Sequence, residues 1–199
     1  MDPNRPILAA LWLSVFTVTY NLIEGVVSVV FSRMDRSAAL LGFGVDSFVE
    51  SLSGMVMIWR FASPQGTERR EHLAARLVGF SFFVLAAYVI YEAVAALRGV
   101  ERIERSPAPL IIAVLSLLVM PTLFALKRWT AIQLGSRSLM ADARQTLACM
   151  LLSGALLIGT GLNYWTGVWQ ADSIAALLIA VFLIREGYQA VTTKERCSC

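Results

Sequence analysis

Two carboxylates lie four residues apart in the stretch GFGVDSFVESLSG, residues 42–54. In a helix, Asp46 and Glu50 share one face, one turn apart. The residues around them, 38–61, are mostly apolar, small or hydroxylated, as in a helix buried in lipid. Each charge near the membrane centre costs about 2.5–3.5 kcal/mol on insertion scales. Two acids on one face therefore indicate a bound cation or a proton-transfer role; the alternative is a pair that hydrogen-bonds neighbouring helices.

A later apolar segment carries a second polar face, because Asp142, Gln145 and Cys149 follow spacings of three and four. With a helical rise of 1.5 Å per residue, Asp46 lies about 12 Å below the outer end of its segment, and Cys149 about 16 Å above the inner end of its own. In a hydrocarbon core about 30 Å thick, these depths place Asp46 level with Cys149. The same reasoning places Glu50 level with Gln145, and Asp142 nearer the cytoplasm.

These side chains suit a divalent cation. Carboxylate oxygens together with a thiolate fit four-coordinate zinc or a similar borderline-soft metal, whereas oxygens alone favour magnesium, calcium or manganese. The predicted metal ligands are Asp46, Glu50, Gln145, Cys149 and Asp142. Alternatives stay open for three of them: Cys149 as an apolar filler, Gln145 as an interhelical hydrogen-bonding group and Asp142 as a first-turn residue favoured by the helix dipole.

Further polar residues are candidates for supporting roles. Asn21 and Glu24 lie one turn apart in the first apolar segment. Glu24 is either a proton relay or a partner of Arg144, which is itself close enough to a helix end to snorkel. Near the C-terminus, Cys197 and Cys199 are either a tethered metal chelator or part of an unstructured chain end.

The composition predicts how these residues are held in place. The chain has 199 residues, of which 57% are hydrophobic and only 16% charged, with a mean hydropathy of +0.67. This balance indicates an all-α integral membrane protein rather than a soluble domain, and the long unbroken apolar runs do not alternate as barrel strands do. We expect one domain over residues 1–199 with six transmembrane helices, at about 7–31, 38–61, 73–97, 108–126, 138–162 and 168–191.

The basic residues predict the orientation. If both termini share one side, that side carries eleven Lys and Arg residues, with Lys127 counted in a loop, against five on the other side. Positive charge favours the cytoplasm, so both termini are expected there, in a multi-pass protein of the cell membrane. The net charge of +3 follows from this bias and indicates no nucleic-acid partner.

Several runs resemble the helices of cation diffusion facilitators. SAALLGFGVDSFVESLSGMVMIW is similar to the second helix of that family, and LMADARQTLACMLLSG to the fifth. WQADSIAALLIAVFLIREG resembles the sixth helix and YNLIEG the first. The match is closest to a short subgroup that consists of the membrane domain alone, so we expect no cytoplasmic ferredoxin-like domain.

The resemblance implies a residue set. The metal pair of the second helix falls on Asp46 and Glu50, and the His and Asp of the fifth helix fall on Gln145 and Cys149. Asp142 matches the Asp of the Ala-Asp-Ala that precedes them. The replacement of His and Asp in the fifth helix departs from the family pattern and from its standard zinc geometry. It implies either a different metal or the recruitment of Asp142 or Glu24 to the site.

The resemblance also implies a function: metal/proton antiport by alternating access, which exports zinc or a similar divalent metal from the cytoplasm. Dimerisation would use the membrane helices. We expect a transporter and not an enzyme, with no permanently bound cofactor, and the sequence has no P-loop for ATP. The alternative function is a membrane metal sensor or accessory protein that binds the ion without moving it.

Overall fold

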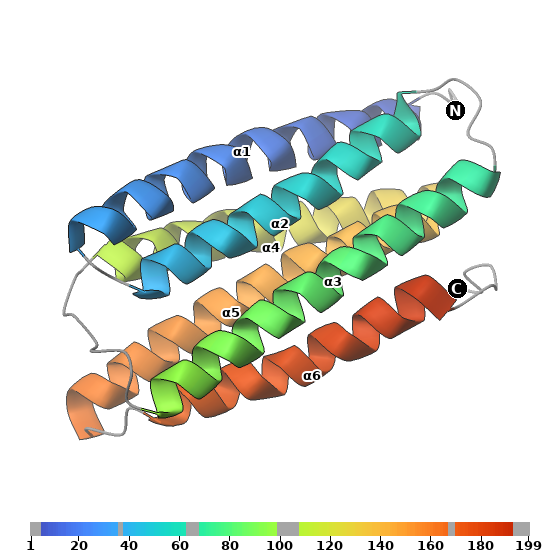
Figure 1. The fold of residues 1–199 in the computed structure, drawn as a ribbon. Helices are drawn as coiled ribbons and strands as arrows, with labels where there is room; N and C mark the ends of the chain where they lie inside the picture. Colours follow the sequence, from blue (N-terminus) through green and yellow to red (C-terminus); the bar gives the residue numbers. More distant parts are fainter. Residues whose placement is uncertain (1–4, 36–37, 63–67, 99–107, 167–169, 193–199) are drawn as a thin grey trace.

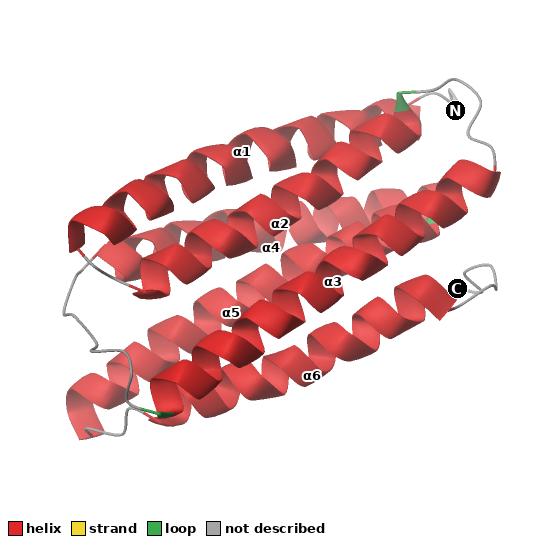
Figure 2. Cartoon of the chain, in the orientation of Figure 1, coloured by secondary structure: helices red, strands yellow, loops and turns green. Residues whose placement is uncertain are grey.

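A computed structural model of the chain describes residues 5–35, 38–62, 68–98, 108–166 and 170–192. These residues are almost all helical, without a strand among them (Figure 2). The helices are α1 (Arg5–Asp35), α2 (Ala38–Phe61), α3 (Glu68–Leu97), α4 (Ala108–Leu134), α5 (Arg137–Thr166) and α6 (Gln170–Thr192).

The six helices pack as a bundle in which α1 lies mainly on α2, α3 on α6 and α4 on α5. In Figure 1, α1 and α2 form one edge, α3 and α6 the opposite edge, and α4 and α5 lie behind α2 and α3. Helix α2 also contacts α3, α4 and α5, so its inner face looks onto the centre of the bundle. Helix α1 begins and α6 ends at the same end of the bundle (Figure 1).

The distribution of side chains is that of a membrane protein. Large apolar side chains point outward, for example Trp12, Leu118 and Leu178, each more than two thirds exposed. Many serine, threonine, amide and charged side chains lie inside, next to an apolar core. So many exposed large apolar side chains are unusual for a soluble bundle and fit a lipid-facing surface.

Four helices are long and apolar enough to cross a membrane, namely those containing Arg5–Met34, Leu41–Phe61, Glu68–Ala95 and Ile111–Leu134. Helices α5 and α6 do not meet this criterion over their described residues. Helix α5 carries Arg137, Asp142 and Arg144 within its first eight residues, which lowers the hydropathy of its first turns. All six segments that the sequence predicts as transmembrane helices are therefore helical. Four of them are long and apolar enough to cross a membrane.

A tight turn joins α4 to α5. Gly135 has a φ of 57°, in the left-handed region that favours glycine, and its N–H donates to the Ile132 carbonyl at 3.2 Å. The Ser136 N–H donates to the Ala131 carbonyl at 3.0 Å, which completes a Schellman motif at the end of α4. The Ser136 hydroxyl then accepts the Leu139 N–H at 3.2 Å and caps the start of α5.

This turn positions two charged residues. Because α4 and α5 run antiparallel from one short turn, residues at equal distances on its two sides meet at the same depth. Lys127 lies eight residues before Gly135, and Asp142 seven residues after it. The turn therefore brings an ammonium and a carboxylate face to face.

A carboxylate of α3 fastens the same turn to the bundle. Glu71 accepts hydrogen bonds from the Ser138 N–H at 2.7 Å, the Ser138 hydroxyl at 2.9 Å and the Ser136 hydroxyl at 2.9 Å. It also pairs with Arg60 at the end of α2 at 2.7 Å. One side chain thus connects α2, α3 and α5.

We expect Glu71→Gln to lower the free energy of unfolding by roughly 1.5–3 kcal/mol, because hydrogen bonds to a charged group are lost and a donor faces Ser138. Denaturant titration of the purified protein in detergent measures the change. Glu68→Gln, an exposed carboxylate one turn earlier on α3, is the matched control. Equal stability of the two variants would show that Glu71 does not fasten the turn.

Candidate metal centre

The acid pair of α2 faces the inside of the bundle. Asp46 is 7% exposed and Glu50 is fully buried. Asp46 Oδ1 and Glu50 Oε2 each lack a hydrogen-bond partner among the described residues. A buried carboxylate oxygen without a donor is costly, so these two oxygens are available to a proton or a cation.

The thiol of Cys149 on α5 lies against this pair. Cys149 is 3% exposed and lies close to both Asp46 and Glu50. The contact between Asp46 and Cys149 agrees with the depths calculated from the two helices. Two carboxylates and one thiol therefore meet between α2 and α5.

Lys127 lies inside a helix and not in a loop. The sequence predicts a loop after a segment that ends at residue 126, but α4 continues to Leu134 and Lys127 is fully buried within it. Helix α4 therefore carries a buried ionisable residue. Removing Lys127 from the count of cytoplasmic charges leaves ten against five, which preserves the bias.

The Lys127 ammonium is held by three oxygens. Its Nζ lies 2.8 Å from Asp142 Oδ2, 2.9 Å from Thr146 Oγ1 and 3.7 Å from Glu50 Oε1. The Thr146 hydroxyl in turn donates to Glu50 Oε1 at 2.5 Å. A polar chain of α4, α5 and α2 groups thus links Asp142 to Glu50.

Asp142 is engaged through both oxygens. Ser53 on α2 donates to its Oδ1 at 2.6 Å, and Lys127 pairs with its Oδ2. The residue is fully buried in the second turn of α5, so it is not an exposed first-turn residue. In this arrangement Asp142 serves as the counter-ion of Lys127.

Gln145 faces a different neighbour. The Ser81 hydroxyl of α3 donates to its Oε1 at 2.8 Å, while its Nε2 has no hydrogen-bond partner among the described residues. The side chain is fully buried. It therefore connects α5 to α3 and does not join the hydrogen bonds around Glu50.

The two candidates on α1 differ in their surroundings. Glu24 accepts hydrogen bonds from Ser47 at 2.8 Å and from Tyr20 at 3.3 Å, and does not pair with Arg144. Asn21 is fully buried, and neither polar atom of its amide has a partner in the described part of the chain. Asn21 can thus contribute an oxygen to a cation or to water inside the bundle.

Arg144 pairs with α6. Its Nη1 lies 2.6 Å from Glu186 Oε2 and 3.1 Å from the amide oxygen of Gln189. The side chain is 40% exposed, as a snorkelling residue would be. Arg144 thus pairs with Glu186 and not with Glu24, which was one of the two alternatives for Glu24.

No three His, Cys, Asp or Glu side chains in the described residues are arranged to hold a metal ion. The Lys127 ammonium contacts oxygens of both Asp142 and Glu50, at 2.8 and 3.7 Å. The donor set of carboxylates, thiol and amide nevertheless fits a divalent cation in chemical type.

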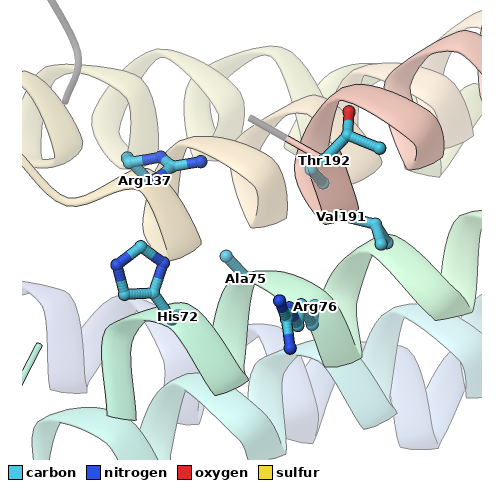
Figure 3. A pocket seen from close by; sticks show the side chains of 7 residues that line it. His72, Ala75, Arg76, Arg137, Val191 and Thr192 are labelled. Carbon is cyan, nitrogen blue, oxygen red and sulfur yellow. The ribbon is translucent and has the colours of Figure 1, made fainter. Parts of the chain in front are cut away.

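A pocket of about 210 Å³ lies elsewhere, between α3, α5 and α6 (Figure 3). His72, Arg76 and Arg137 contribute its charged or ionisable lining, and Ala75 and Thr192 are among the others. Two guanidinium groups repel a cation, so this pocket is unsuited to metal. Residues Cys197 and Cys199, the predicted tail chelator, lie outside the described residues.

The fold and the buried site together define a helical membrane protein with a polar, carboxylate-rich centre. Residues 7–193 match the family model described as the cation efflux transmembrane domain. The chain belongs to this cation efflux family, as its sequence motifs predicted.

Several curated proteins are similar to the chain. It is 24% identical over 181 residues to transmembrane protein 163 of Xenopus laevis, which covers 89% of the chain and 64% of that relative. It is 24% identical over 168 residues to the cation-efflux pump FieF of Klebsiella pneumoniae, an alignment that covers 78% of the chain and 56% of that relative. An uncharacterized transporter of Methanocaldococcus jannaschii is 23% identical over 189 residues, an alignment that covers 90% of the chain and 66% of that relative. The chain thus spans between about half and two thirds of the length of these curated relatives.

Proposed function

We propose that the protein is a secondary transporter that moves a divalent transition-metal cation, zinc first among them, out of the cytoplasm in exchange for protons. The observation that carries the proposal is the buried acid pair of α2, in which Asp46 Oδ1 and Glu50 Oε2 have no hydrogen-bond partner among the described residues. The buried thiol of Cys149 on α5 lies close to this pair. Membership of the cation efflux family supports it.

The charge of the buried centre agrees with a divalent ion. The buried centre contains three carboxylates, Asp46, Glu50 and Asp142, and one ammonium, Lys127, which pairs with Glu50 and Asp142. With all four groups ionised, two negative charges remain, which one divalent cation or two protons would neutralise. Exchange between these two states is the basis of antiport, because the same carboxylates accept either.

Alternating access is proposed as the means of exchange. The site would open to one side of the membrane with metal bound and to the other with protons bound. All six helices would cross the membrane, with both termini in the cytoplasm; the location of the start of α1 and the end of α6 at one end of the bundle supports this topology. We further propose that the protein is located in the cell membrane as a homodimer associated through its membrane helices.

Purified protein in liposomes tests the function. Metal uptake is followed with a metal-sensitive dye for zinc, cadmium, cobalt, manganese and magnesium, and proton movement with a pH-sensitive dye. An imposed pH gradient should drive zinc flux, and zinc should drive proton movement. Metal binding without flux would instead identify a sensor or accessory protein, and flux that ignores the pH gradient would reject antiport.

Cys149 should set the metal preference, because a thiolate favours zinc, cadmium and cobalt over manganese and magnesium. Cys149→Ser is expected to weaken binding of the softer metals by about 10–100-fold, and Cys149→Asp to shift preference towards the harder ones. Competition titrations against the same metal panel measure the change. An unchanged profile in both variants would show that Cys149 only fills space.

A further inference from the structure

Lys127 is a basic side chain without exposed surface, and the proposed transport cycle does not yet give it a role. Its neighbour Arg128 is exposed, so the helix turns one charge outward and the other inward. A buried ammonium is costly unless oxygens surround it. Its position among three oxygens therefore calls for an explanation.

The three contacts of Lys127 are unequal. Nζ is close to Asp142 and Thr146, at 2.8 and 2.9 Å, but 3.7 Å from Glu50. Asp142 is itself fixed by Ser53 at 2.6 Å. The ammonium is thus anchored on one side and only loosely engaged on the side of the predicted metal ligand.

We propose that Lys127 is a tethered cation that competes with the transported metal for Glu50, anchored by Asp142. The inference rests on the proposed function. A metal ion at Glu50 and an ammonium nearby repel each other strongly in a low-dielectric interior. The metal must therefore displace Lys127 from Glu50 towards Asp142, and the metal-binding affinity is lower than the carboxylates and thiol alone would give.

Such a competitor suits a carrier. A site that releases its ion on the far side must not bind it too tightly, and an internal cation lowers the affinity without removing a ligand. The ammonium can return to Glu50 when the metal leaves, so that the carboxylate does not stay unpaired in the bundle.

Zinc titration calorimetry at one fixed pH, on purified protein in detergent, tests the inference. Lys127→Met should bind zinc at least about tenfold more tightly than the wild type, because a positive charge beside the site is removed. Arg128→Met, which removes an exposed charge at the adjacent position, should bind zinc like the wild type. A folded Lys127→Met protein with equal or weaker zinc affinity would overturn the proposal.

A charge-balanced double variant keeps the test possible if Lys127→Met alone does not fold. Lys127→Met combined with Asp142→Asn removes the ammonium and its anchor together, and should also bind zinc more tightly than the wild type, by a smaller factor. Equal or weaker binding in this double variant would likewise overturn the competition. A wild-type protein that binds no divalent metal would instead reject the proposed function.

Discussion

Asp46→Asn and Glu50→Gln should each reduce zinc flux in liposomes by about 100-fold or more. Each change removes a ligand charge from the buried face of α2, and even residues that only orient a metal ligand alter affinity or activity by 10–100-fold. Flux is normalised to the amount of monodisperse protein inserted, so that a loss of expression is not counted as a loss of transport.

Glu68→Gln serves as the control, because it neutralises an exposed carboxylate at the start of α3. It should transport like the wild type. Normal flux in Asp46→Asn would show that the proposed ligand set is wrong.

Asp142→Asn should destabilise the protein by about 3 kcal/mol, because it leaves Lys127 buried without its closest charged partner. Unfolding by denaturant in detergent, without added metal, measures the loss. The additional change Lys127→Met should restore more than half of it, since the unpaired ammonium is then gone.

This double-mutant cycle separates two roles of Asp142. A counter-ion of Lys127 gives strong coupling between the two substitutions. A residue that acts only as a metal ligand gives a metal-free Asp142→Asn protein as stable as the wild type, and no rescue by Lys127→Met.

The helices and the acid pair could be predicted from sequence because their signals are local. Long apolar runs define the helices, and the four-residue spacing of Asp46 and Glu50 places both on one face. Helical rise alone was enough to match Asp46 with Cys149 across two helices, since both helices are regular at that level.

Lys127 could not be placed by hydropathy, because a charge near the end of an apolar run is read as the start of a loop. The overlooked signal is Gly135 followed by Ser136. A C-terminal glycine and an N-cap serine end α4 and begin α5 there, which extends α4 past Lys127 and sets it opposite Asp142. The neighbour of Gln145, by contrast, depends on the packing of α3 against α5, which no local pattern encodes.

The measurement that tests the metal centre most directly is X-ray absorption at the zinc edge, on protein in which Cys197 and Cys199 are replaced by Ser. Binding at Asp46, Glu50 and Cys149 predicts one sulfur at about 2.3 Å and oxygens at about 2.0–2.2 Å, with the sulfur signal lost in Cys149→Ser. A zinc shell that contains no sulfur, or that is unchanged by both Cys149→Ser and Asp46→Asn, would contradict this metal centre.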